Sequence, residues 1–479
     1  MKFNVFCNNT KTKVLLEISE NDNGSAYASN IDDALLQAEQ EIKLLDETIE
    51  TVNTLKPQCD KIDYALAASS GALCGLLDVF LIASPGDSFL GNVTDKWFEE
   101  RTCDFAKLCG WKGNSENSVK SAIGYLEKTF KVPYDQRGCG DAGRMVFDLT
   151  PSNHHFKSLA HNPSLLGLFF SVLNQFTNTS HFVSDGQLIS LQEADGKFEL
   201  QGNNFISKLW CGIVNWIGHL MSDISGASGS KSRGTGIPSP LWTWTNSVIA
   251  IKAKLGLPAN EFDKSVNELA LNLFNEGYDV RFQTAQAIPV LINELIVRLL
   301  YAVRRLIKYY RDTPRAERSF KCMWKTCEPF KNLTVRRMLT VAHGTFCLID
   351  AGDAVVRGFI TGGGMFNPVE FFLRLNLVGV GRLTISLYGE TKLAISYYRA
   401  QKKAEFAKSE KIIVEDYIEG LKLLQSLYED KEYLACIKDL IEGRYLEAFK
   451  KSQAYAESQG VPDTIIIRTK SEIDKHFLK

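Results

Sequence analysis

Residues 285–303 read AQAIPVLINELIVRLLYAV, and residues 304–337 continue as RRLIKYYRDTPRAERSFKCMWKTCEPFKNLTVRR. The first stretch holds only Glu294 and Arg298 as charged residues, and it is close to the length of about 20 residues that an apolar helix needs to cross a bilayer. The second stretch holds eleven Lys and Arg against three Asp and Glu. A short basic segment next to apolar segments is typical of a cytoplasmic loop. The two stretches therefore predict a membrane-spanning helix followed by a loop in the cytoplasm.

Five further stretches share the apolar composition of 285–303, and they are 62–84, 163–183, 203–222, 338–360 and 366–388. Six spans arranged around a cytoplasmic basic loop leave both chain ends in the cytoplasm. The pattern predicts an integral protein of the cytoplasmic membrane, so the expected partner is the lipid bilayer. Buried helices of a large soluble all-α protein would give a similar pattern, and this alternative stays open.

The overall composition excludes several classes of protein. The chain has 479 residues, of which 45% are hydrophobic, and a formal net charge of −1. A near-neutral chain is neither a strongly basic nucleic-acid binder nor an acidic disordered protein, so we expect no nucleic-acid partner. The eleven cysteines form no CxxC pair, which argues against a zinc ribbon and a disulfide framework.

The charged residues divide the chain into three predicted domains. Residues 1–60 begin with a short strand pair and continue as an amphipathic helix that ends near Pro57. Residues 61–388 form the apolar helical core. Residues 389–479 are charged and helical in pattern, with Gly460 and Pro462 as terminators. The predicted fold class is mainly α: a polytopic helical membrane bundle with a short N-terminal strand pair and a C-terminal helical cap.

Five of the seven histidines lie between positions 154 and 219. His219 and Asp223 are spaced i, i+4, so on a helix they face the same way. An imidazole and a carboxylate at that spacing are a common way for one helix to bind a divalent metal ion. In an alternating topology, the end of the first apolar stretch, the start of the second and the end of the third lie on one side of the bilayer. This side carries the predicted metal ligands Asp78, His155, His161, His219 and Asp223.

Ligands of these types suit a divalent transition metal, with Zn²⁺ as the first expectation and Mn²⁺ or Fe²⁺ as alternatives. We expect His154 and His181 to lie at the surface or to support the ligands. A Gly/Ser-rich loop follows the third stretch and carries Lys231 and Arg233. It is either a flexible connector or a phosphate-binding loop.

A second polar stripe combines His343, Asp350, Asp353 and Arg357, which recur on one face of a helix. Such a stripe is typical of an ion-paired seam between packed helices. The alternative is a layer that supports the metal site or contacts a substrate headgroup.

Three stretches between residues 78 and 240 resemble membrane-bound metal-dependent hydrolases of the YdjM type, which are distantly similar to zinc-dependent phospholipase C-like proteins. They are Leu76-Leu77-Asp78 with Asp87-Ser88-Phe89-Leu90-Gly91, then His155 to His161, then Gly218-His219 to Asp223 with Gly226 and Pro238. The family pairs two aspartates with a histidine in its first motif, where this chain has Asp78 alone and Asp87 as the nearest substitute. The resemblance implies a zinc-type site at these positions.

The leading hypothesis is a membrane-bound metal-dependent hydrolase that acts on a phosphoester of a lipid or of a membrane-proximal substrate. A metal-activated water would be the catalytic group. The alternative is a non-enzymatic membrane scaffold that recruits cytoplasmic partners through the basic loop and the C-terminal helices. The sequence leaves the oligomeric state open.

Overall fold

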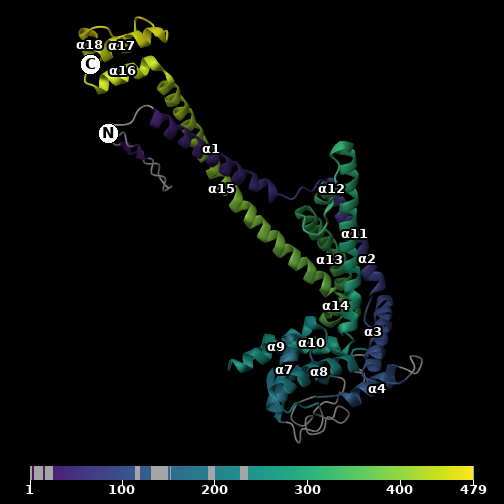
Figure 1. Cartoon of the computed structure of the whole chain (residues 1–479). Helices are drawn as coiled ribbons and strands as arrows, with labels where there is room; N and C mark the ends of the chain where they lie inside the picture. Colours follow the sequence, from purple (N-terminus) through teal and green to yellow (C-terminus); the bar gives the residue numbers. More distant parts are fainter. Residues whose placement is uncertain are drawn as a thin grey trace. The chain divides into compact units, whose positions relative to one another are not determined.

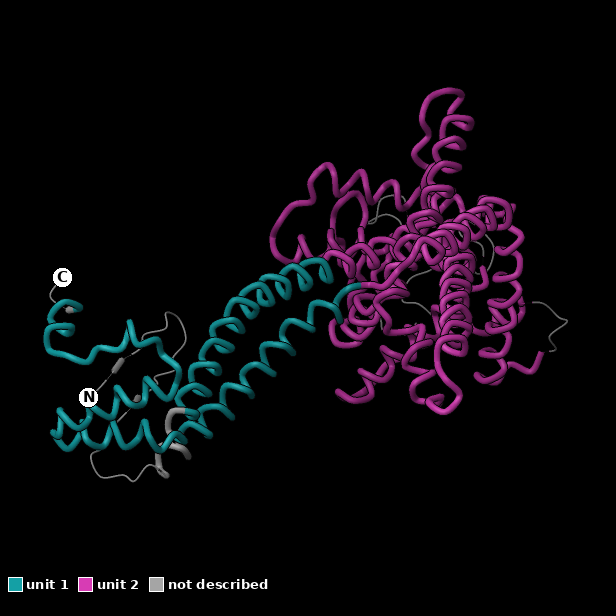
Figure 2. Tube along the Cα trace, turned by 90° about the horizontal axis from the view of Figure 1, so that it is seen from above, with its two compact units in different colours: residues 1–56, 392–479 teal, residues 57–391 magenta. Residues whose placement is uncertain are grey.

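The computed structural model describes residues 3–4, 15–16, 25–113, 119–130, 149–150, 153–192, 200–226 and 236–477. The described residues are mainly helical, as predicted. They divide into two compact units, shown in Figure 2: unit 1 comprises residues 1–56 and 392–479, and unit 2 comprises residues 57–391. The sequence analysis treats the two ends of the chain as separate domains, whereas the structure groups them in one unit.

Unit 1 contains the predicted strand pair and the charged helices. Phe3–Asn4 (β1) pairs antiparallel with Leu15–Leu16 (β2), and helix α1 ends before Pro57 as expected. Gly460 follows helix α17 with φ of 74°, a conformation that glycine adopts without strain at a helix end. The helices of this unit are α1 (Ser25–Thr54), the part of α15 (Leu377–Glu429) from Lys392 onward, α16 (Lys431–Ile441), α17 (Tyr445–Ser458) and α18 (Lys470–Phe477).

Three long helices form a bundle in unit 2: α2 (Lys61–Leu81), α11 (Val280–Asp312) and α13 (Leu333–Thr361), each in contact with the other two (Figure 1). Small residues let α2 and α13 approach closely. A Cβ atom built on Gly71 would lie 2.1 Å from the carbonyl oxygen of Ala342, so only glycine fits at this crossing. The short helices η2 (Arg315–Glu317), α12 (Phe320–Cys327) and α14 (Pro368–Arg374) and the first part of α15 complete this region.

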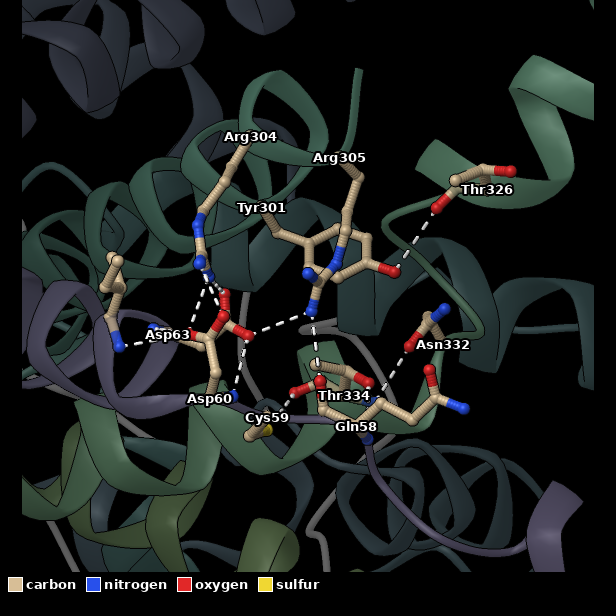
Figure 3. Close-up of polar contacts among 11 residues, drawn as sticks. Gln58, Cys59, Asp60, Asp63, Tyr301, Arg304, Arg305, Thr326, Asn332 and Thr334 are labelled. Carbon is tan, nitrogen blue, oxygen red and sulfur yellow. Dashed lines mark hydrogen bonds and ion pairs between the residues drawn. The ribbon is translucent and has the colours of Figure 1, made fainter. Parts of the chain in front are cut away.

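One end of the bundle is held by a group of charged residues (Figure 3). The fully buried Asp63 of α2 forms ion pairs with Arg304 and Arg305 of α11. The backbone N–H of Gln58 donates to Thr334 Oγ1 at the start of α13 with a distance of 3.0 Å. These contacts join the three helices at the point where the apolar part of α11 gives way to the basic segment.

The prediction of six spans is wrong for the described residues, where three helices are long and apolar enough to cross a membrane: α2, α11 and α13. The stretch 163–183 forms a helix of 13 residues, α7 (Leu165–Thr177), and then a strand. Asn178 takes a left-handed conformation with φ of 50° and ends the helix. Thirteen residues give a helix of only about 20 Å.

The stretch 203–222 forms helix α8 (Phe205–Asp223), which is not among the candidate spans. The stretch 366–388 is interrupted, because α14 ends at Arg374 and α15 begins at Leu377. Composition alone therefore predicts too many membrane spans, because it does not show where each helix ends.

The other part of unit 2, here called the helical lobe, gathers at one end of the bundle (Figure 1). It includes a hairpin of β3 (Thr179–Ser184) and β4 (Gln187–Gln192), whose turn residues Asp185 and Gly186 both have positive φ, as two-residue hairpin turns require. Buried apolar side chains around Phe156, Phe274 and Tyr278 form its main core. Its longer helices are α3 (Phe89–Leu108), α4 (Val119–Thr129), α7, α8, α9 (Pro240–Lys254) and α10 (Glu261–Asn275).

Candidate metal centre

Four buried histidines converge in the helical lobe. His154 and His155 lie on the short helix α6 (His154–Lys157), His161 ends the 3-10 helix η1 (Leu159–His161), and His219 lies in the last turn of α8. Each offers a ring nitrogen, and these nitrogens all lie within 4.8 Å of one another. Among the described residues this is the one group of three or more His, Cys, Asp or Glu side chains with that property.

A turn between two short helices brings His154, His155 and His161 together. Ser158 separates α6 from η1 with an extended conformation, φ −76° and ψ 123°, and pairs with Phe182 of β3 as an isolated bridge. The turn brings the ring centres of His155 and His161 to 5.2 Å. Phe156 is buried in the lobe core against Phe274, with ring centres 6.0 Å apart. The core thus anchors α6 beside the histidines.

The antiparallel pair α7–α8 brings His161 to His219. Ser171 Oγ donates to the carbonyl of Gly212 at 2.9 Å, and Trp216 Nε1 donates to the carbonyl of Asn162 at 3.0 Å. A Cβ atom on Gly212 would lie 2.7 Å from the backbone of α7, so the close crossing depends on glycine. As a result the ring centres of His161 and His219 lie 3.9 Å apart.

Asp223 lies beside the four histidines. Its Oδ2 atom is 3.1 Å from His155 Nε2 and 3.9 Å from His219 Nδ1, and it accepts a hydrogen bond of 2.8 Å from Ser222 Oγ. Neither ring nitrogen of His155 has a hydrogen-bond partner, so the carboxylate of Asp223 lies close to Nε2 without a well-aligned hydrogen bond. A carboxylate on one ring nitrogen and a vacant lone pair on the other is the usual arrangement of a histidine that binds a metal.

Burial determines the charge of these groups. It lowers the pKa of His161 well below the usual value, and the neighbouring His219, His155 and His154 lower it further. Burial also lowers the pKa of His219 to about 3, with His155 acting in the same direction and Asp223 against it. Burial alone would raise the pKa of Asp223, but the nearby histidines, His155 above all, bring it far below the usual range. At neutral pH His161 and His219 are therefore neutral and Asp223 is ionised.

The residues fit a transition metal ion. A neutral imidazole offers one nitrogen lone pair, and neither ring nitrogen of His219 has a hydrogen-bond partner although the side chain is buried. An unsatisfied buried polar atom costs about 1–3 kcal/mol, a cost that a bound metal would remove. Zinc–imidazole bonds of about 2.0–2.1 Å place the nitrogens of a tetrahedral site about 3.3 Å apart, so nitrogens that lie within 4.8 Å of one another would move closer together on binding one ion.

The structure places the other predicted ligand, Asp78, in a different network. Asp78 Oδ1 accepts a hydrogen bond of 2.5 Å from Asn376 Nδ2, and the backbone N–H of Asn376 donates to Asp350 Oδ2 at 2.9 Å. Asn376 lies at the break between α14 and α15 and so joins α2 to α13. Conversely, His154 belongs to the group of four, although the sequence analysis assigns it a supporting role. Its position next to His155 was the signal that could have identified it.

The remaining predicted residues lie outside the group of four. Asp353 accepts a hydrogen bond of 2.8 Å from Arg374 Nε and lies 3.6 Å from Arg357 Nε, and His343 Nε2 lies 3.6 Å from Glu294 Oε1. This pattern matches the ion-paired seam rather than a layer around the histidines. Asp87 is exposed in the turn after α2, and His181 lies on β3 with Nδ1 3.2 Å from the side chain of Asn174. Lys231 and Arg233 lie outside the described residues.

A cavity of about 340 Å³ opens between the loop after α2, the start of α3 and the segment that joins α10 to α11. Its lining includes Arg281, which pairs with Asp95 at 3.1 Å and Asp279 at 2.9 Å. Arg281 Nη1 also donates to the carbonyl of Ser225 at 3.5 Å, two residues beyond Asp223. Arg281 thus links the cavity to the segment that follows α8, although neither Asp223 nor any of the four histidines lines the cavity.

No protein-family model, curated protein or solved structure matches the chain. The resemblance to YdjM-type hydrolases therefore remains a prediction from the motifs.

Proposed function

We propose that unit 2 is a membrane-associated, metal-dependent hydrolase that acts on a phosphoester of a lipid or of a membrane-proximal substrate. The observation that carries the proposal is the convergence of four buried histidines beside Asp223, with both ring nitrogens of His219 lacking hydrogen-bond partners. A protein core without a metal has little reason to gather four buried imidazoles, because buried polar groups normally have hydrogen-bond partners.

His154, His155, His161 and His219 would hold the metal, and Asp223, whose Oδ2 atom lies 3.1 Å from His155 Nε2, would help to orient that ring. A bound divalent metal supplies Lewis acidity and lowers the pKa of a coordinated water. An imidazole binds a metal through an unprotonated nitrogen, so a divalent ion held by imidazoles beside one carboxylate would leave such a centre with a net positive charge. This charge favours an anionic phosphoester over a neutral ester. The metal is proposed to be zinc, with manganese or iron as alternatives.

The membrane part of the proposal is supported by the three candidate spans and by their outward faces. On α11, Leu291, Leu295 and Leu299 recur on one side of the helix and are 59–66% exposed. Exposed leucines along a long helix are typical of contact with lipid. The proposed location is the cytoplasmic membrane.

The test is to purify the full chain in detergent and to measure its metal content and its hydrolysis of a chromogenic phosphodiester. Wild type should carry about one transition-metal ion per chain and hydrolyse the substrate, and His219→Ala should lose both. His181→Ala is the matched control, because this buried histidine of the same lobe lies outside the group of four. Wild-type protein that takes up no transition metal would refute the proposal.

A second candidate function is a non-enzymatic scaffold with a structural metal. It is favoured by the burial of all four histidines and by their absence from the lining of the cavity. Structural zinc sites are closed, whereas catalytic sites keep one position open. Protein that binds metal and unfolds more easily when the metal is removed, but that hydrolyses no phosphoester, would favour the scaffold.

A further inference from the structure

Helices α7 and α8 expose an unusual amount of apolar surface. We call this surface the α7–α8 face, and it consists of Leu165, Phe169, Phe176, Phe205, Ile206 and Trp210. Leu165 is 86% exposed and Ile206 is 77% exposed. Exposed apolar patches of this kind mark surfaces that contact another molecule or a membrane.

The exposed residues are arranged in two stripes that meet. Leu165, Phe169 and Phe176 are spaced by four and seven along α7, and Ile206 and Trp210 by four along α8, so each set lies on one side of its helix. The rings of Phe176 and Phe205 join the stripes, with their centres 5.5 Å apart. Because the helices run antiparallel, the stripes form one surface on a helix pair that carries His219 on α8 and that packs against η1, where His161 lies.

The charges on this surface suit an anionic lipid. Helix α7 contains no charged residue, and α8 contains only Lys208 before it reaches Asp223. The Lys208 ammonium lies 5.5 Å from the ring centre of Phe176, at the edge of the face. An apolar stripe with aromatic residues and a flanking cation is typical of helices that lie in the membrane interface.

The helix pair is too short, and its connection too polar, to cross the bilayer. Helix α7 has 13 residues and is about 20 Å long, against an apolar core of about 30 Å. The β3–β4 hairpin connects α7 to α8 at the Phe176 end and exposes Gln187 and Ser190. These polar groups would have to enter the hydrocarbon if the pair inserted lengthwise.

We propose that the α7–α8 face lies in the headgroup region of an anionic membrane and holds the metal centre at the lipid surface. This inference rests on the proposed membrane association of unit 2. It narrows the proposed substrate to a phosphoester of a lipid headgroup, since the face lies on the helix pair that carries His219 and contacts η1 with His161.

The experiment places a small fluorescent amino acid at single exposed positions of the full chain. The protein is reconstituted into vesicles of phosphatidylcholine and phosphatidylglycerol that contain a lipid with a quenching spin label near its headgroup. Positions 206 and 210 report on the α7–α8 face. Position 190, exposed on β4 of the same lobe, is the matched control, and position 295 on α11 reports on the bundle.

We expect several-fold stronger quenching at 206 and 210 than at 190. Metal content equal to wild type shows that a labelled chain is folded. Position 295 lies near the middle of the apolar stretch 285–303, so it is measured in a second set of vesicles with the spin label in the acyl chains. Quenching at 295 in these vesicles, without quenching at 206 or 210 by the headgroup label, overturns this inference and leaves membrane association intact. No quenching at 295 by the acyl-chain label overturns membrane association itself. Crosslinking of position 206 to a second copy of the chain would also overturn the inference, because the face would then be a subunit interface.

Discussion

Asp223→Asn separates the role of the carboxylate from that of the histidines. Asparagine keeps the shape of the side chain but removes its charge. Of the contacts made by Asp223 Oδ2, the one with His155 Nε2 at 3.1 Å is within hydrogen-bond range, whereas His219 Nδ1 at 3.9 Å is not. We therefore expect the change to affect the orientation and basicity of one ring among four.

The expected magnitude follows from this geometry. Loss of a carboxylate that orients a metal-binding histidine typically weakens metal affinity about 10–100-fold, which corresponds to about 1.4–2.8 kcal/mol. The stoichiometry of about one metal per chain should be retained, because all four imidazoles remain. His219→Ala removes one of the imidazoles and should have a larger effect that includes loss of stoichiometric metal.

The assay is competition for zinc between the purified chain and a chromophoric chelator of known affinity. Asp263→Asn is the matched control, since this carboxylate of the same lobe pairs with Lys252 rather than with a histidine. Affinity that is unchanged in Asp223→Asn would refute the orienting role. Complete loss of metal in a folded Asp223→Asn chain would instead make Asp223 a ligand, as the sequence pattern alone suggests.

Three more changes test packing, ion pairs and metal dependence. Gly218→Ala builds a Cβ atom 2.2 Å from Cγ of Phe130 and should cost about 1–3 kcal/mol in thermal unfolding. The same change should cost less in a Phe130→Ala background, where Cγ is absent, and an equal cost in both backgrounds would contradict this packing. Asp63→Ala leaves two arginines of α11 without their buried partner and should cost about 3–5 kcal/mol in denaturant unfolding. Asp60→Ala removes the N-cap of α2 and a side chain that is 51% exposed, and it should cost only about 1–2 kcal/mol; equal costs for the two variants would contradict the role given to the burial of Asp63. Removal of metal by EDTA should destabilise unit 2 by about 2.7 kcal/mol if free metal had been at 100 times its Kd, and an unshifted unfolding curve would show that the native state holds no metal.

Local patterns in the sequence account for much of this structure. The helical segments, the end of α1 before Pro57 and the apolar character of α2, α11 and α13 follow from composition and spacing. The nearness of His219 to Asp223 follows from helical geometry alone. These features depend on residues within a few turns of one another, and such residues are neighbours in any helix.

The tertiary structure decided which distant residues meet. His161 reaches His219 because Gly212 lets α8 pack closely against α7. Asp78 lies in an apolar helix, and its sequence pattern is that of a metal ligand. Its side chain instead accepts a hydrogen bond from Asn376, which lies at the break between α14 and α15, and no periodic pattern predicts this break. The sequence by itself determined the helices and the kinds of side chain they carry. The close approach of backbones and the places where helices stop decided which histidines form the site.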